Sequence, residues 1–275
     1  GDWSSDVCSS DLGGHDVLGI DPAKNISKIA NEQGITTLPK FFSQDLVSSK
    51  VELINKFDVV FARNVLPHVK KIHSVIKGIE LCLKKDGICA IEFHDASVIL
   101  KELHYDSIYH EHLFYFSINT ITNLFKRYNL NAFDILKSPI SGGSWIIYFS
   151  KIKKKKSNRI LYQLQKENNF KTNEISAWVS FAKKSIKHSK KLNNLININK
   201  TEVIGYGASA RSSTLLNFCK IDHKSVKYII DKNPLKHNMY TPGTNIKIVS
   251  PEHFKEDMSN VKIIIILAWN FESEI

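Results

Sequence analysis

Cysteine is scarce in this sequence, and no two cysteines form a CxxC pair. The 275 residues include four of them, at Cys8, Cys82, Cys89 and Cys219. This spacing argues against a zinc site and against a disulfide framework. We therefore expect free thiols and no bound metal.

Long hydrophobic runs are missing as well. No apolar run reaches the roughly 18 to 20 residues that a membrane helix needs, and no signal segment with a charged start and an apolar centre opens the chain. These absences predict a soluble, cytoplasmic protein without a membrane partner. At 275 residues the chain exceeds the usual single domain of about 100 to 200 residues, so we expect two compact units.

Acidic residues are too few to balance the basic ones, with 27 against 38 and a formal net charge of +11. Lysines concentrate in residues 151–156 and 183–191. Such a basic field attracts polyanions, so a basic nucleic-acid-binding protein is the non-enzymatic alternative. Lysines on exposed helix faces are usually solvated, however, and a nucleotide-diphosphate substrate would use the same field. We expect no nucleic-acid partner.

The two ends of the chain differ from the rest. Residues 1–12, GDWSSDVCSSDL, have neither a helical nor an alternating apolar period, and they resemble the translated read-through of a sequencing adapter. We interpret them as non-native sequence. At the other end, the chain stops shortly after an apolar strand without a closing helix. We therefore expect truncation at both ends.

From Gly13 onward, short apolar runs alternate with amphipathic stretches, which is typical of parallel sheets covered by helices. We expect a first unit at residues 13–150, a helical connector at 151–198 and a second unit at 199–275. Strands are expected at residues 17–20, 57–62, 88–93, 203–204, 226–230 and 263–267, and helices at 23–33, 69–83 and 212–219. The predicted fold class is α/β, with two Rossmann-like doubly wound units.

The later part of the first unit has its own signals. Ser117 is the expected N-cap of a helix at residues 118–128. Residues 132–136 and 145–149 are expected to form an antiparallel edge that closes the sheet. The helix at 69–83 is expected to end at the sequence KKDG at 84–87, before the strand that follows it.

Polar residues follow the predicted strands of the first unit, where ligands bind in doubly wound sheets. Asp21 ends the strand at residues 17–20, and its carboxylate can accept hydrogen bonds from the ribose hydroxyls of an adenosyl group. An acidic turn residue before proline is the alternative interpretation. Arg63 and Asn64 follow the next strand, and Glu92 lies near the end of the third. Glu92 is either part of the site or a buried structural carboxylate.

The second unit contains a glycine turn. Residues 205–210, GYGASA, fit the pattern GxGxxA after a strand, and Asp231 ends the following strand. This arrangement is close to the dinucleotide-binding fingerprint. An NAD-dependent nucleotide-sugar dehydrogenase or epimerase is therefore the enzymatic alternative.

The segment YDSIYHEHLFYF, at residues 105–116, gathers Tyr109, His110, Glu111 and His112 among aromatic residues. A carboxylate beside imidazoles in an apolar setting has the ingredients of a general base tuned toward neutral pH. A metal site is a competing interpretation, because His110 and His112 would share one face of an extended strand. No further ligand stands at a typical spacing. A solvated loop of histidines is the third interpretation.

Several strings together resemble the sugar C-methyltransferase family over about residues 15–275. They are DSIYHEHLFYFS at 106–117, GGS at 142–144, GYGASARSSTLLNF at 205–218, IIDKNPLKHNMYTPGT at 229–244 and LAWNF at 267–271. The resemblance implies a class I methyltransferase domain that uses S-adenosylmethionine, followed by the family's C-terminal region from near residue 97. It also implies removal of a proton from carbon 3 of a nucleotide-linked 4-keto deoxysugar and transfer of methyl to the resulting enolate.

The resemblance also implies roles for four catalytic residues. His112, the last histidine of YHEH, becomes the base, and Tyr109 and Glu111 orient the sugar or stabilise the enolate. His68 of NVLPH is similar to the family's further active-site histidine. Regular strand alternation would separate Glu111 from His112, so these roles require an irregular loop. Donors at the developing oxyanion would replace any need for a metal.

Binding residues follow from the same resemblance. Asp21 holds the ribose of S-adenosylmethionine, and Arg63 with Asn64 meets its methionine end. In the second unit, a nucleotide sugar would lie against the turn amides and Arg211. The substrate-binding residues implied are Gly205, Gly207, Ser209 and Arg211, unless this unit is an inherited fold without a ligand. The family's zinc module and first-strand glycine loop are not recognisable before Gly13, so we expect no zinc in this chain and weak cofactor binding.

Overall fold

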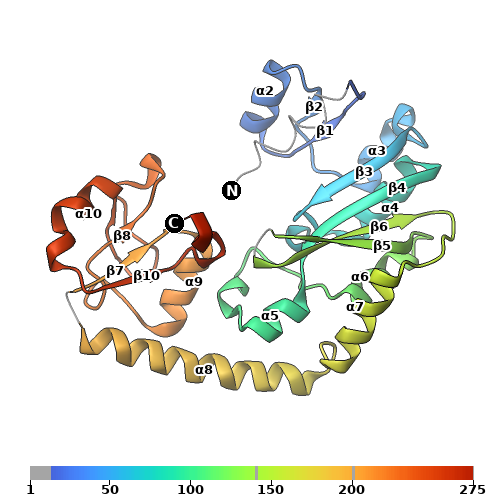
Figure 1. Cartoon of the computed structure of the whole chain (residues 1–275). Helices are drawn as coiled ribbons and strands as arrows, with labels where there is room; N and C mark the ends of the chain where they lie inside the picture. The colour runs from blue at the N-terminus through green and yellow to red at the C-terminus, as the bar shows by residue number, and fades with distance from the viewer. Residues whose placement is uncertain (1–13, 140–141, 200–201, 275) are drawn as a thin grey trace.

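The computed structural model describes residues 14–139, 142–199 and 202–274 (Figure 1). Residues 1–12 and Cys8 lie outside this part, so their interpretation stays a prediction. The described chain forms two α/β units, and the long helix α8 (Ile175–Ile198) leads from the first to the second (Figure 1). The α/β class expected from the alternation of apolar and amphipathic stretches is confirmed. No helix in the described part is long and apolar enough to cross a membrane.

The main sheet of the first unit has the order β3-β4-β6-β5. The parallel pair is β3 (Phe57–Arg63) and β4 (Leu83–His94), and β6 (Ser144–Ser150) runs antiparallel to both β4 and β5 (Asn131–Ser138). The predicted antiparallel edge is therefore confirmed. The helix expected to end at KKDG ends earlier, at Cys82, and β4 runs through residues 84–87. Phe57 of β3 pairs with Leu83 and Val59 pairs with Ile88, so residues 84–87 of β4 form a bulge.

A second, smaller sheet lies near the start of the described chain. It pairs β1 (Gly19–Ile20) with β2 (Thr37–Leu38) in parallel, and α2 (Lys24–Glu32) connects them. The expectation placed the first of these strands in one sheet with β3. Within the described residues no strand pairs with both, so the two sheets remain separate. The side chains of Val59 and Phe61, which share one face of β3, are exposed.

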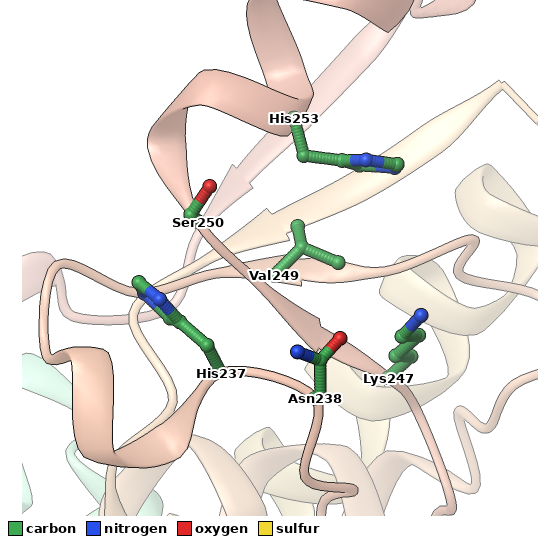
Figure 2. A pocket seen from close by; sticks show the side chains of 6 residues that line it. All are labelled: His237, Asn238, Lys247, Val249, Ser250 and His253. Atoms are coloured by element: carbon green, nitrogen blue, oxygen red, sulfur yellow. The ribbon is translucent and has the colours of Figure 1, made fainter.

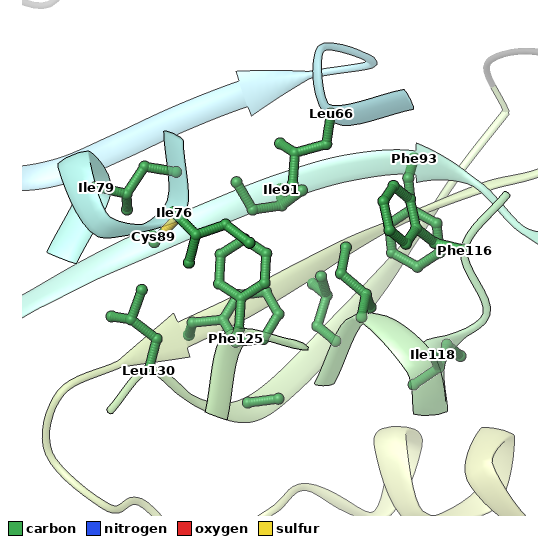
Figure 3. Close-up of a cluster of buried hydrophobic side chains, with 14 of the residues drawn as sticks. Leu66, Ile76, Ile79, Cys89, Ile91, Phe93, Phe116, Ile118, Phe125 and Leu130 are labelled. Carbon is green, nitrogen blue, oxygen red and sulfur yellow. The ribbon is translucent and has the colours of Figure 1, made fainter. Parts of the chain in front are cut away.

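The core of the first unit forms where helices cover the main sheet. Apolar residues of α4 (Ile72–Cys82) and α6 (Ile118–Lys126) meet those of β4, and the ring of Phe125 stacks on that of Phe149 with centroids 4.1 Å apart (Figure 3). Burying one such side chain contributes about 1.5 to 3 kcal/mol. Ser117 caps α6 as predicted, since its Oγ accepts a hydrogen bond from the Thr120 amide.

The remaining elements of the first unit are short. They are the helices α3 (Gln44–Ser49) and α5 (Ala96–Glu102), and the 3₁₀ turns η1 (Val51–Leu53), η2 (Leu66–His68) and η3 (Tyr105–Ser107). The sequence interpretation missed α3 and α5. In the connector, α7 (Asn158–Asn169) packs on the first unit through Ile160, so it belongs to that core rather than to a free linker.

The second unit is a parallel sheet in the order β10-β7-β8-β9, with all three pairings parallel. Its strands are β7 (Val203–Tyr206), β8 (Ile229–Ile230), β9 (Ile248–Val249) and β10 (Ile263–Ile266), its helices are α9 (Ala210–Cys219) and α10 (Pro251–Asp257), and the turns η5 (Pro234–Lys236), η6 (Met258–Asn260) and η7 (Trp269–Glu274) complete it. β8 starts later than predicted, because the Val226 amide donates to the Asp222 carbonyl and closes a turn there.

The two units share apolar packing. Ile99 and Tyr105, which follow β4 in the chain, lie in one buried cluster with Phe181 of α8 and Leu216 of α9. The segment that leads to YHEH is thus packed against the second unit. The candidate catalytic residues of this segment therefore lie next to the second unit.

Candidate active site

The YHEH segment folds as an irregular loop. It begins with η3, and the His112 amide then donates to the Tyr109 carbonyl at 3.1 Å, which closes a tight turn. The irregular loop that the catalytic roles require is therefore present. The metal interpretation depended on His110 and His112 sharing a strand face, and it is wrong because no strand exists here. Among the described residues, no three His, Cys, Asp or Glu side chains are grouped to hold a metal ion.

His112 is held by the carbonyl of Ser107. Its Nδ1 lies 3.0 Å from that oxygen, which only accepts hydrogen bonds, so Nδ1 carries the proton. Burial lowers the pKa of His112, and the nearby His68 lowers it further. The ring is therefore neutral near pH 7, and its Nε2 has a free electron pair. This Nε2 lies 3.3 Å from the Tyr109 hydroxyl.

His68 comes from another element, η2 at the end of β3. Its ring centroid lies 4.8 Å from that of His112, and its Nδ1 donates to the Glu111 carbonyl at 3.0 Å. The Pro67 carbonyl accepts a hydrogen bond from the Leu113 amide at 2.8 Å, which joins η2 to the loop. The structure thus brings His68, Tyr109 and His112 together. Glu111 contributes its carbonyl, while its side chain is exposed.

Asp21 lies where the sequence predicted, after β1. Its Oδ1 accepts a hydrogen bond from the Ala23 amide at 2.7 Å, and within the described chain its Oδ2 accepts none. One carboxylate oxygen is therefore open to a ribose hydroxyl, so this residue fits the adenosyl group. The Oδ1 of Asp21, which accepts from the Ala23 amide, has the role that the interpretation as an acidic turn residue gives it.

Arg63 and Asn64 end β3 beside Glu92. The Arg63 Nε donates to the Glu92 carboxylate at 2.5 Å, and the Ser138 hydroxyl donates to its other oxygen. Glu92 is buried and each of its carboxylate oxygens accepts a hydrogen bond, as the structural-carboxylate interpretation requires. Asn64 has a positive φ of 49°, a left-handed conformation that turns the chain away from the strand.

The glycine turn follows β7. Gly207 has φ +92°, and a Cβ there would lie 2.4 Å from the Ala268 Cβ, so glycine is needed for backbone packing whether or not a ligand binds. Gly205 is equally confined, because a Cβ would meet Leu267 at 2.7 Å. Ser209 is the N-cap of α9, and its Oγ accepts from the Ser212 amide.

Asp231 is occupied by its own unit. Its Oδ2 accepts from the Ala208 amide at 2.8 Å and from the Lys236 ammonium at 3.1 Å, and its Oδ1 accepts from the Asn233 amide. In a dinucleotide site, the acid at this position binds the ribose hydroxyls. Here both oxygens are already bonded and Lys236 lies against the carboxylate. This geometry does not favour the NAD alternative.

Two family models match the chain almost end to end. Residues 4–134 match a methyltransferase domain, and residues 139–275 match the C-methyltransferase C-terminal domain. The chain belongs to the C-methyltransferase family. The resemblance noted from the YHEH, glycine-turn and LAWNF strings is thereby confirmed at the level of the family.

Among the curated relatives of this chain is C-methyltransferase NovU from Streptomyces niveus, which is 28% identical over 264 residues. The alignment covers 94% of this chain and 62% of the relative, so the chain spans under two thirds of the relative's length. Among solved structures, 1,6-didemethyltoxoflavin-N1-methyltransferase from Burkholderia thailandensis is 15% identical with a TM-score of 0.41, covering 55% of this chain and 67% of its own. A methyltransferase from Methanosarcina mazei is 16% identical with a TM-score of 0.41, covering 53% and 87%.

Arg211 faces a carboxylate. Its guanidinium Nε lies 3.0 Å from Asp106 Oδ2, and the Trp269 indole nitrogen donates to the same oxygen at 2.8 Å. The phosphate-facing role of Arg211 stays a prediction. The sequence interpretation did not single out Asp106 or Trp269. Both fall inside the strings that carry the family resemblance, and this was the only sequence signal that pointed to them.

A shallow pocket of about 210 Å³ indents the second unit between β9 and the start of α10 (Figure 2). Its lining residues are His237, Asn238, Lys247, Val249, Ser250 and His253. None of the residues implied in catalysis or substrate binding lines this pocket. The candidate active site is therefore formed by Tyr109 and His112 of the loop together with His68 of η2. The second unit contacts the start of this loop at Asp106.

Proposed function

We propose that this chain is a C-methyltransferase that uses S-adenosylmethionine to methylate carbon 3 of a nucleotide-linked 4-keto deoxysugar. The observation that carries the proposal is the state of His112. Its ring is neutral, its Nδ1 proton is fixed on the Ser107 carbonyl, and its Nε2 electron pair faces the Tyr109 hydroxyl. An imidazole held by a carbonyl in this way is prepared to accept one proton.

The proton that His112 accepts comes from carbon 3 of the sugar. The C–H electron pair forms the double bond between carbons 3 and 4, and the ketone oxygen becomes the enolate oxygen. Tyr109 is the neighbouring donor that can stabilise this oxyanion, because its hydroxyl lies beside Nε2 of His112. His68 lies in ring contact with His112, and its Nδ1 proton is held by the Glu111 carbonyl. The exposed Glu111 carboxylate would contact a sugar hydroxyl. The ketone itself acidifies the C–H bond.

S-adenosylmethionine, when bound, supplies the methyl group for carbon 3. Asp21 would hold its ribose through Oδ2, the oxygen that remains open in the described chain. Arg63 and Asn64 would lie toward its methionine end, where β3 ends beside η2. This arrangement agrees with ligand binding at the carboxyl ends of parallel strands.

The nucleotide diphosphate would lie against the second unit. Gly205, Gly207 and Ser209 form the turn that opens α9, and Arg211 stands in the helix's first turn. The first amides of a helix and the positive end of its dipole favour a phosphate at this point. The net charge of +11 supports the same partner.

The proton-transfer step is tested separately from methyl transfer. The protein is incubated in deuterated water with S-adenosylhomocysteine and 4-keto-6-deoxyglucose linked to thymidine diphosphate or, in a parallel sample, to uridine diphosphate. We expect loss of the carbon-3 proton signal, measured by NMR, with at least one of the two sugars. A protein that binds either sugar without any exchange would contradict the proposal. A change in nicotinamide absorbance with added NAD would instead support the dehydrogenase alternative.

A further inference from the structure

The loop that carries His112 is fastened at its start to the second unit. The Arg211 guanidinium of α9 contacts the Asp106 carboxylate of η3 with two nitrogens, Nε at 3.0 Å and Nη2 at 3.4 Å. Trp269 of η7 donates its indole N–H to the same carboxylate, and the guanidinium lies 4.5 Å from the centroid of its ring. The side chains of Arg211 and Asp106 are only 14% and 5% exposed.

Tyr105, the residue before Asp106, is held by the same unit. Its hydroxyl lies 2.8 Å from Nδ1 of His188 on α8 and 3.4 Å from Sγ of Cys219 on α9. Two consecutive residues of η3 therefore bond to α8, α9 and η7. A buried ion pair adds little net stability, because desolvation of both charges offsets their attraction. Its directional bonds instead fix geometry, which is their effect on η3.

Ser107, the residue after Asp106, makes the bond that orients the base. Its carbonyl accepts the Nδ1 proton of His112 at 3.0 Å. Asp106 is thus one peptide unit away from the oxygen that decides which ring nitrogen carries the proton. A rotation of η3 would move this carbonyl, and Nδ1 would lose its partner.

We propose that Asp106, Arg211 and Trp269 are positioning residues, through which the second unit holds the Ser107 carbonyl and so keeps Nε2 of His112 unprotonated and available as the base. The catalytic consequence rests on the function proposed above. The positioning itself does not, because the protonated nitrogen of His112 can be observed without any substrate.

The charge of Arg211 provides a second link to His112. The groups that face the His112 ring are His68 from η2, Arg211 from α9, and Tyr109, Glu111 and Tyr115 from its own loop. Burial and His68 lower the pKa of His112 most, the bond to the Ser107 carbonyl raises it, Arg211 lowers it and Glu111 raises it. Replacing Arg211 with a neutral residue removes both its charge and its hold on η3. Replacement with lysine keeps the charge and removes only the contact through two nitrogens.

The first measurement is ¹⁵N NMR of histidine-labelled protein without ligand, with the His112 signals assigned by their loss in His112→Gln. The variants are Asp106→Asn, Arg211→Lys and Trp269→Phe, the last of which keeps the ring over Arg211. The control is Lys227→Gln, which breaks a 2.7 Å ion pair to Asp257 elsewhere in the second unit. The second measurement is carbon-3 exchange with the two 4-keto sugars, as rate against sugar concentration.

We expect Nδ1-protonated His112 in the unaltered protein and a mixture of both tautomers in Asp106→Asn. The maximal exchange rate of Asp106→Asn should fall by about 10²-fold, the effect of a small misplacement of a catalytic group, while KM changes less than about threefold. The maximal exchange rate of Arg211→Lys should fall by about tenfold, with both His112 tautomers present. Lys227→Gln should match the unaltered protein in both measurements.

The proposal is wrong if Asp106→Asn and Arg211→Lys fold and leave the His112 tautomer unchanged. Should either fail to fold, Trp269→Phe decides in its place by the same criterion. Failure of the proposed function gives a different pattern. In that case no exchange occurs in the unaltered protein, yet Asp106→Asn still shifts the tautomer, and the positioning proposal stands.

Discussion

Two pairs of neighbouring histidines lie between the main sheet of the first unit and the second unit, and their surroundings differ. His68 and His112 are half-buried, and their Nδ1 atoms donate to backbone carbonyls. His94 and His104 are 6% and 7% exposed, with His104 Nδ1 3.4 Å from His94 Nε2 and the Trp269 ring 4.3 Å from that of His104. Burial lowers the pKa of His94 to about 3 and that of His104 to about 4.

His112 and the buried pair are therefore neutral at pH 7, but only His112 has the geometry of a base. His112 keeps its Nε2 beside a single hydroxyl, whereas the nitrogens of the buried pair face each other in a closed core. A low pKa by itself does not make a histidine catalytic. An open nitrogen and a partner that fixes the tautomer are also required.

The largest expected effect separates the two pairs by activity. His112→Ala should lower carbon-3 exchange by about 10²- to 10⁴-fold, the usual contribution of a general base, while the melting temperature stays nearly unchanged. The matched control is His110→Ala, two residues earlier and exposed, which should exchange at the normal rate. Equal losses in both variants would show that the loop, and not the His112 imidazole, is what matters.

The next effect concerns stability in acid. The folded pKa values of His94 and His104 lie below the unfolded value of about 6.5, so the unfolded state binds more protons below pH 6.5. Their contribution to stability is full above pH 6.5 and is lost as the pH falls toward 4, roughly 2 kcal/mol for each at pH 5. Burial raises the pKa of Asp95 to about 6, so at pH 5 the folded state binds more protons at this carboxyl than the unfolded state does. This group therefore adds about 1 kcal/mol to the stability at pH 5 relative to pH 7.

Urea unfolding at pH 7 and pH 5 measures the sum of these three contributions to the free energy of unfolding. We expect the free energy of unfolding to be about 3 kcal/mol lower at pH 5. A stability that is equal or higher at pH 5 would mean that the buried pair is hydrated and protonated in the folded protein. The two histidine pairs would then not differ in the way described.

The variant His104→Phe measures how much His104 alone contributes to the loss of stability in acid. Phenylalanine keeps an aromatic ring against Trp269 and removes one titrating group. The difference in unfolding free energy between pH 7 and pH 5 should shrink by roughly 2 kcal/mol, which leaves about 1 kcal/mol. His73→Phe, at an exposed histidine, is the control and should keep the full difference. An unchanged difference in His104→Phe would assign the acid sensitivity to other groups.

Local structure in this chain followed from local sequence. The cap at Ser117 and the antiparallel edge were predicted, because capping and alternation act over a few residues. The irregular loop at YHEH followed only as a requirement of the catalytic roles, and it is present. The bulge at residues 84–87 was missed, since nothing in KKDG shows that Leu83 before it and Ile88 after it both pair with β3.

The contacts that complete the site lie far apart in sequence. Asp106, Arg211 and Trp269 belong to different strings, and no periodicity indicates that one carboxylate accepts from both of the others. The role of Asp231 was equally hidden, because a strand-end aspartate looks the same whether it binds a ribose or Lys236. Residue types and strand ends predicted which groups take part in the site. Their pairing needed the tertiary fold.

The smallest expected effect tests the contact that distinguishes His112 from the buried pair. The Tyr109 hydroxyl lies 3.3 Å from Nε2, a long hydrogen bond between neutral groups, which contributes about 0.5 to 1.5 kcal/mol. Tyr109→Phe keeps the ring against His112 and removes only the hydroxyl, so exchange should slow by about two- to tenfold, measured at saturating sugar. Tyr128→Phe is the matched control, because its hydroxyl lies 2.7 Å from Nδ1 of the exposed His73. A loss near that of His112→Ala would mean that Tyr109 itself moves the proton. A faster reaction would show that the Tyr109 hydroxyl competes with the substrate for Nε2 of His112. The electron pair of Nε2 would then be less available in the free protein than the exposure of His112 suggests.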